Sequence, residues 1–322
     1  MQIKHIYHNE LIKKAIKKYS YDKIISQEST NEDFYDNYSF YFHKKNLNDL
    51  KLNSDLIYGG LIPMTSNCHI AAAKSLIFKE NNLCWKFFER SALFYVYSNL
   101  CNDISFVDLT AHILNLALYV ERFDLIDILL SKINIDLDSS INEMDKNIIK
   151  QEIYPSTYLI HFLLEKLGIF NPSKEKIFKL GKGVGIYEKI ISEWDTSFSV
   201  MEESYWNSLC EYHLEGIGVT GTSRKAEEFL FLGLVPMELI NLFKVRKKLG
   251  MDIPEISHEL FKTPMATYPK IPTGYNQELD VKFQLFDITK KSINLGNLKQ
   301  YTFNDVIAML KEKHGENANL FY

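Results

Sequence analysis

The stretch CEYHLE, residues 210–215, gathers the side chains most able to do chemistry. It places a thiol at Cys210, an imidazole at His213 and carboxylates at Glu211 and Glu215. Such groups ligate transition metals and serve as acids, bases or nucleophiles. Zinc needs three or four convergent ligands, and Cys210 and His213 supply only two, with no second pair evident in the sequence. A metal site here would need further ligands from distant parts of the chain.

Helical spacing favours a different interpretation of the same residues. Trp206, Leu209, Cys210 and His213 stand at i, i+3, i+4 and i+7, which is one face of a helix and its apolar stripe. We therefore expect Cys210 to be a buried thiol and His213 a hydrogen-bonded core imidazole. We predict no catalytic, cofactor-binding or metal-binding residue in the chain.

Two glycine-rich stretches are candidates for a phosphate or nucleophile site. GKGVG at 181–185 lacks both the spacing and the Lys-Ser/Thr pair of a phosphate loop. GIGVTGTS at 216–223 lacks the spacing and the strand–turn context of a nucleophile elbow. The first is predicted to interrupt a helix and allow close packing, and the second to connect two helices, with Gly216 ending the earlier one.

The nine histidines are scattered and form no HExxH or HxH motif. His258 follows Glu255 at the E-x-x-H spacing, but at a loop-like helix start. An enzyme with a metal site assembled from distant helices stays open as an alternative. The basic run KVRKK at 244–248 and the Glu pair at 202–203 are interpreted as solvated helix faces, or else as a surface for a protein partner.

Composition restricts the class of protein. Acidic and basic residues are mixed and the net charge is −4, which does not fit a nucleic-acid binder. The N-terminus lacks the apolar core of a signal peptide, and the longest apolar stretch is broken by Pro236 and Glu238, so no membrane association is predicted. None of the four cysteines forms a CxxC pair, which favours reduced, mostly buried thiols and a cytoplasmic location.

Sparse glycine and proline, together with repeated capping signals, indicate long helices. Ser140 with Glu143 and Ser199 with Glu202 have the capping-box spacing, and Gly250 stands where a left-handed residue would close a helix. Helices are predicted near 9–19, 33–44, 67–80, 82–101, 106–119, 122–132, 141–168, 174–194, 200–215, 223–232, 236–249 and 303–313.

The predicted fold is therefore all-α, a multi-helix array or bundle with a mixed C-terminal extension. An N-terminal helical layer is expected over 1–133 and a C-terminal bundle over 134–262, with one continuous domain as the alternative. The proline-rich stretch 263–277 predicts that the extension, 263–322, begins as irregular chain. The alternation in 278–289 then favours a short strand or extended arm, ahead of a terminal helix.

Residues 205–266 resemble the C-terminal region of bacterial immunity proteins from polymorphic toxin systems, most closely the Imm49 family. Trp206 and the helix with Tyr212-His213 come first, followed by a helix that ends in LGLVP. Lys244-Val-Arg246, Asp252-Ile-Pro254, His258-Glu-Leu260 and Pro264-Met-Ala266 complete the similarity. The resemblance implies an all-α cytoplasmic protein that binds one cognate toxin and has no enzymatic activity.

We therefore expect an immunity protein that neutralises its toxin by stoichiometric binding. A helical-repeat scaffold and an enzyme with a non-local metal site are the alternatives. Four carboxylates beside the apolar stripe are the predicted partner-binding residues, because a charged patch with exposed aromatics suits a protein interface. These residues are Glu202, Glu203, Glu211 and Glu215.

Overall fold

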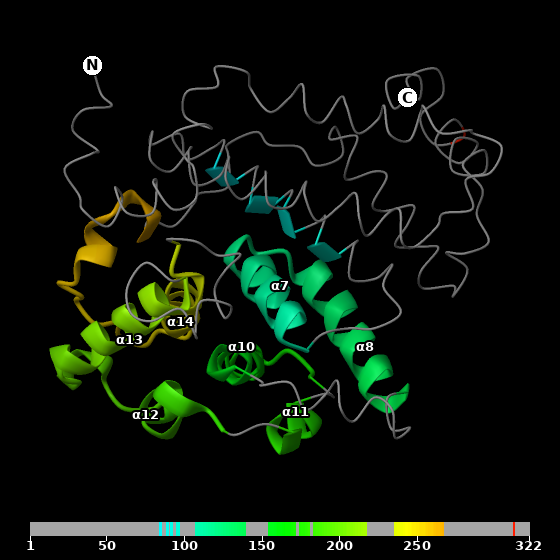
Figure 1. Ribbon diagram of the computed structural model, residues 1–322, viewed down its shortest axis with the longest axis horizontal. Helices are drawn as coiled ribbons and strands as arrows, with labels where there is room; N and C mark the ends of the chain where they lie inside the picture. The colour runs from blue at the N-terminus through cyan, green and yellow to red at the C-terminus, as the bar shows by residue number, and fades with distance from the viewer. Residues whose placement is uncertain are drawn as a thin grey trace.

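The computed structural model describes residues 84–85, 88–89, 91–92, 95–96, 107–139, 154–171, 174–180, 183–217, 235–266 and 312. Within these ranges the chain forms seven α-helices, four short 3-10 helices and no strand, which confirms the predicted all-α class (Figure 1). The predicted helices before residue 82 and at 223–232, and the predicted arm at 278–289, lie outside the described residues, as does nearly all of 303–313.

The α-helices are α7 (Val107–Tyr119), α8 (Phe123–Ser139), α10 (Pro155–Lys166), α11 (Lys174–Leu180), α12 (Glu188–Ser192), α13 (Glu203–Gly216) and α14 (Met237–Lys248). The 3-10 helices are η1 (Gly185–Tyr187), η2 (Phe198–Val200), η4 (Glu259–Lys262) and η5 (Pro264–Ala266). No helix in the described ranges combines the length and the apolar character that crossing a bilayer requires.

The α7–α8 hairpin turns at Glu121, whose φ of 60° is unusual for a residue with a side chain. Lys244 of α14 secures this turn, because its Nζ lies 2.5 Å from Glu121 Oε1 and donates to the Leu118 carbonyl at 3.3 Å. α8 then runs to Ser139, beyond its predicted end at 132 and across the predicted domain boundary after residue 133. Ile133 continues the buried face of α8 at this point.

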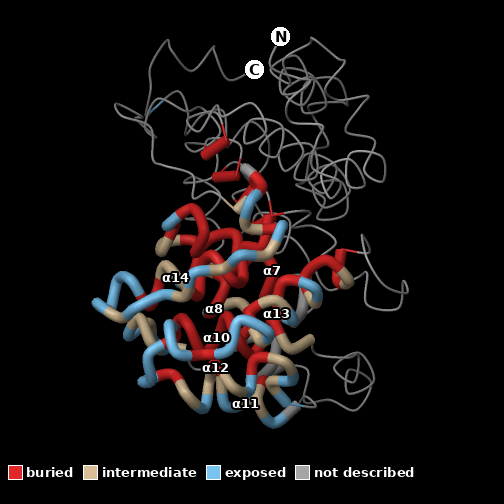
Figure 2. The backbone as a smooth tube through the Cα atoms, turned by 90° about the vertical axis from the view of Figure 1, so that its left-hand side faces the viewer, coloured by how far each residue is buried: buried red, intermediate tan, exposed pale blue. Residues whose placement is uncertain are grey.

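α10 lies at the centre of the described residues and packs against α7 and α14. All nine residues from Ser156 to Leu164 are buried, so the helix is enclosed on every side (Figure 2). The predicted single helix over 141–168 is wrong, since α10 begins at Pro155. Proline is favoured at the first helical position because its fixed φ suits a helix and its missing N–H would be unpaired there anyway.

The predicted helix over 174–194 is also divided. α11 ends at Leu180, and the chain then passes Gly183 (φ 105°) to reach η1, which begins at Gly185 (φ 55°) and is followed by α12. A Cβ added at Gly185 would lie 2.8 Å from Cγ of Pro155. The interpretation of this stretch as a helix interruption is therefore confirmed, and close packing is confirmed at Gly185 but not at Gly183, where an added Cβ would meet nothing within 4 Å.

The end of α14 and the start of α13 test two of the capping predictions. Gly250, with φ of 73°, follows α14 as predicted. The capping box of Ser199 and Glu202 is wrong: α13 begins at Glu203, and the Glu202 side chain caps nothing. Ser199 instead belongs to η2, where its backbone N–H donates to Asp252.

A single cluster of buried apolar side chains links all of these elements. It includes Leu114 of α7 and Leu129 of α8 together with Leu159 of α10, Leu209 of α13 and Leu239 of α14. The described parts of the two predicted units therefore share one core, which holds α13 and α14 in the arrangement that the next section describes.

Candidate functional site

The stripe of α13 is buried as predicted. Trp206 and Leu209 are 1% exposed, and Cys210 and His213 are fully buried. Burial, with the neighbouring charge of Glu238 and then of Glu211, raises the pKa of the Cys210 thiol far above its ordinary value. The thiol therefore stays protonated, and it is not an activated nucleophile.

His213 pairs with a carboxylate that the sequence did not single out. Its Nδ1 lies 2.8 Å from Oε1 of Glu238 on α14, and both side chains are fully buried. The second carboxylate oxygen of Glu238 has no hydrogen-bond partner among the described residues. Cys210, His213 and Glu238 are enclosed in the core and present no reactive atom to a substrate in solvent. A signal existed for Glu238, since it is the one carboxylate in the apolar stretch Val235–Phe243.

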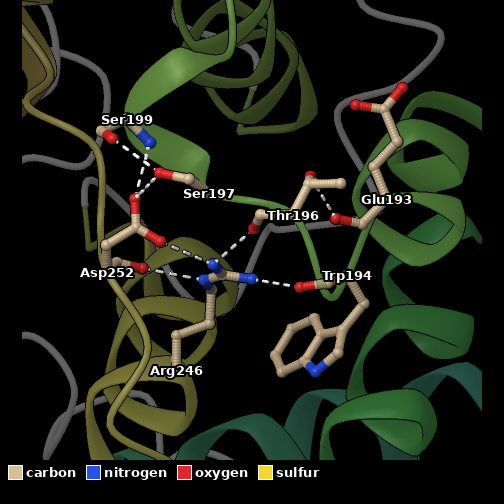
Figure 3. Close-up of polar contacts among 7 residues, drawn as sticks. All are labelled: Glu193, Trp194, Thr196, Ser197, Ser199, Arg246 and Asp252. Atoms are coloured by element: carbon tan, nitrogen blue, oxygen red, sulfur yellow. Dashed lines mark hydrogen bonds and ion pairs between the residues drawn. The ribbon is translucent and has the colours of Figure 1, made fainter.

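Arg246, in the run predicted to be a solvated face, is only 1% exposed, so that prediction is wrong for this residue. Its Nε donates to the Asp252 carbonyl at 2.8 Å, and its Nη2 donates to Asp252 Oδ1 and to the Thr196 carbonyl, both at 2.9 Å. Its Nη1 donates to the carbonyl of Trp194 (Figure 3). These bonds tie the end of α14 to the chain between α12 and α13.

Aromatic rings cover the same guanidinium. Its Cζ lies 3.4 Å from the ring centre of Phe198 and 5.2 Å from that of Trp194. A planar guanidinium suits such contacts because it stacks on ring faces while its edge still donates hydrogen bonds. This explains how α14 tolerates a buried cation next to two exposed lysines, Lys247 and Lys248.

Asp252 completes the cluster from the other side. Its Oδ2 accepts from Ser197 Oγ at 2.6 Å and from the Ser199 backbone N–H at 2.8 Å. These bonds, led by that of Ser197 and joined by that of Arg246, hold the pKa of Asp252 well below its ordinary value. The carboxylate is thus fixed in its charged form, and it joins residues 197–199 to the chain after α14.

Residues 251–258, which we call the strap, are attached to α13 at further points. Ser257 Oγ donates to Glu203, and His258 Nε2 lies 2.9 Å from Glu211 Oε1. The backbone N–H of Leu260 donates to His258 Nδ1 at 3.1 Å, so this ring nitrogen is the acceptor. Nε2 then carries the ring proton and donates a hydrogen bond to Glu211. The strap therefore follows α13 from before its first residue to its middle.

The four predicted partner-binding carboxylates have different environments. Glu202 is exposed and accepts a hydrogen bond from Ser204 Oγ at 3.2 Å. Glu203 and Glu211 are exposed but hold the strap, and Glu215 is half-buried. Glu203 and Glu211 therefore contact the strap at different residues, Ser257 and His258, whereas Glu202 is directed to solvent.

Other ionisable groups in the described residues also serve internal contacts. Among those residues, no group of three or more His, Cys, Asp or Glu side chains is arranged to hold a metal ion. Burial lowers the pKa of His112 and of His161 to about 4, and His161 Nδ1 accepts from the Asn171 amide at 2.6 Å.

Two exposed aliphatic side chains beside the hydrogen bond between Ser199 and Asp252 were not predicted from the sequence. Val200 is 79% exposed and Ile253 is 43% exposed, and each directly follows a residue of the Ser199–Asp252 hydrogen bond. The sequence gives no signal for this pair, because nothing in it brings residues 200 and 253 together. No protein-family model, curated protein or solved structure matches this chain.

Proposed function

We propose that this protein is an immunity protein that neutralises a cognate toxin by stoichiometric binding. The resemblance of residues 205–266 to immunity proteins supports the proposal. The observation that carries it is how that segment uses its polar groups. Its thiol and imidazole, on Cys210 and His213, and its guanidinium, on Arg246, are buried, while hydrogen bonds attach the strap to residue 199 and to the start of α13.

The residues behind the resemblance have structural roles. Trp206 and His213 lie in the core, Arg246 and Asp252 join two segments, and His258 attaches the strap to α13. A surface that is already ordered loses little conformational entropy when it binds, which favours high affinity. Such a surface suits a protein that acts by occupying its target rather than by transforming it.

A titration of toxin activity tests the proposal. The toxin encoded beside the gene for this protein is assayed with increasing amounts of the purified chain. Stoichiometric binding predicts a linear loss of toxin activity that ends at a fixed molar ratio, with a complex of that composition by light scattering. An enzyme that modifies the toxin would inactivate it at far lower ratios. Lack of both protection and complex formation would refute the proposal.

A further inference from the structure

Two segments from distant parts of the sequence lie side by side and are joined at two places. At one end, Asp252 accepts hydrogen bonds from Ser197 and Ser199. At the other end, Ser257 donates to Glu203. Between these contacts run residues 200–202 of one segment and 253–256 of the strap, so their relative position is fixed by tertiary bonds rather than by a shared helix.

Four side chains between the two contacts are exposed. Val200 and Ile253 are aliphatic, and they are two of the four large exposed hydrophobic residues in the described part of the chain. Glu202 and Glu255 are the carboxylates beside them. We call these four residues the Val200 surface. Met201, between Val200 and Glu202, is only 9% exposed. The chain therefore places Val200 and Glu202 in solvent and packs the side chain between them into the core.

Negative charge predominates in the two segments that form this surface. Residues 193–203 and 251–259 contain no lysine or arginine. Two cations reach them from outside these segments: the buried Arg246 pairs with Asp252, and the exposed Lys262 pairs with Glu259 at 2.6 Å. The two segments contribute seven carboxylates, at Glu193, Asp195, Glu202, Glu203, Asp252, Glu255 and Glu259. Asp252 and Glu259 are the two in these ion pairs, and the other five give the segments their excess of negative charge. The whole chain has a net charge of −4, so the negative charge here is a local concentration.

We propose that the Val200 surface is the docking face for a basic protein, which places an apolar contact on Val200 and Ile253 and surrounds it with lysine or arginine. This inference rests on the proposed function, in which that protein is the toxin. An apolar centre with a charged rim is the usual anatomy of a specific interface. The carboxylates steer a positive partner toward the surface, and the aliphatic pair holds it after contact.

The Arg246 cluster gives this surface its stability. Asp252 is bound by Arg246 from within and by Ser197 and Ser199 from the side, so the backbone that carries Ile253 is fixed to the backbone that carries Val200. Fixing the backbone that carries both aliphatic side chains before binding lowers the entropy lost on association. Arg246 is therefore a positioning residue for the surface and does not itself contact the partner.

The experiment measures binding of the purified full chain to the toxin encoded beside its gene. Val200→Ser with Ile253→Ser removes the apolar centre and should raise Kd on the order of 10- to 100-fold, mainly through faster dissociation. Glu202→Lys with Glu255→Lys reverses the rim and should slow association at low salt by about tenfold or more. This second effect should shrink in about 0.5 M salt, where the charges are screened.

Matched changes elsewhere provide the controls. Phe170→Ser removes an aromatic side chain that lies beyond the end of α10 and is 83% exposed. Glu175→Lys reverses an exposed charge on α11. Neither control should change the affinity for the toxin. Thermal unfolding of every variant should stay close to that of the parent, because all the altered side chains are exposed.

The outcomes separate this inference from the proposed function. If the parent chain binds and both double variants bind equally well, the Val200 surface is refuted and the immunity function stands. If the parent chain neither binds nor protects, both are refuted together. If light scattering shows that the free chain is a dimer that Val200→Ser with Ile253→Ser dissociates, and toxin binding is unchanged, the surface belongs to a second copy and the proposal is overturned.

Discussion

Arg246 shows why residue type and sequence neighbourhood do not settle where a charge lies. The guanidinium is surrounded by the carbonyls of Trp194, Thr196 and Asp252, the Asp252 carboxylate and two aromatic rings. An ammonium group cannot reproduce this arrangement, because its donors do not lie in one plane and it does not stack on ring faces.

Arg246→Ala is expected to lower the free energy of unfolding by about 2–4 kcal/mol, since it leaves the buried carbonyl of Trp194 unpaired, removes three part-buried hydrogen bonds and takes the cation from Asp252. Arg246→Lys should recover only part of this loss. Urea unfolding measures both changes. Lys247→Ala, at the exposed neighbouring position, is the control and should stay within about 0.5 kcal/mol of the parent. A loss below about 1 kcal/mol in Arg246→Ala would show that the cluster is not structural.

The buried pair of His213 and Glu238 permits a second test at the residue scale. Glu238→Gln keeps an acceptor near His213 Nδ1, whereas Glu238→Ala removes it from a fully buried site. We expect Glu238→Ala to cost about 2–4 kcal/mol and Glu238→Gln clearly less.

A double-mutant cycle with His213→Ala isolates the pair from its surroundings. Coupling of about 1 kcal/mol or more in the free energy of unfolding is expected, because the two groups are in direct contact. Additive losses would mean that Glu238 and His213 contribute independently, through packing alone.

At the scale of elements, periodicity predicted well what lies on one helix. The buried stripe of Trp206, Leu209, Cys210 and His213, the end of α14 before Gly250 and the extent of α7 all follow from local pattern. What failed depended on contacts between distant residues. Ser199 did not cap α13 because its N–H is bonded to Asp252, and Arg246 is buried because three segments converge on it.

The same limit applies to the candidate site. The exposure of Glu202 near the start of α13 could be predicted, because the apolar stripe of that helix shows which face turns away from the core. The placement of Val200 and Ile253 on neighbouring segments could not, since it depends on the bond between Ser199 and Asp252, which are 53 positions apart in the sequence. One sequence carries no direct record of such long-range contacts.

Two left-handed glycines allow backbone strain to be separated from crowding. At Gly250 an added Cβ meets nothing within 4 Å, whereas at Gly185 it lies 2.8 Å from Pro155 Cγ. Gly250→Ala should therefore cost about 1 kcal/mol of stability from conformation alone. Gly185→Ala should cost at least about 1 kcal/mol more, because α10 must also move. Urea unfolding compares them directly, and equal losses would show that the Pro155 contact yields without cost.

On the scale of the whole molecule, two buried histidines connect the stability of the shared core to pH. His112 lies on α7 and His161 on α10, and burial lowers the pKa of each to about 4 from an ordinary value of 6.5. Between those values the unfolded chain takes up protons that the folded chain excludes. The contribution of these neutral histidines to the free energy of unfolding is therefore fully present above about pH 6.5, and it is lost as the pH drops toward 4.

Each histidine is expected to account for up to about 3 kcal/mol of this loss, since one pKa unit corresponds to about 1.4 kcal/mol. Urea unfolding at several pH values between 7.5 and 4 measures the slope. His161→Gln and His112→Gln should each flatten the pH dependence, whatever each costs in stability at pH 7.5. Asp252 does not interfere in this range, because its pKa is held below that of an ordinary carboxyl group and its contribution is lost only at lower pH. An unchanged slope in both variants would show that neither imidazole is kept neutral by the core.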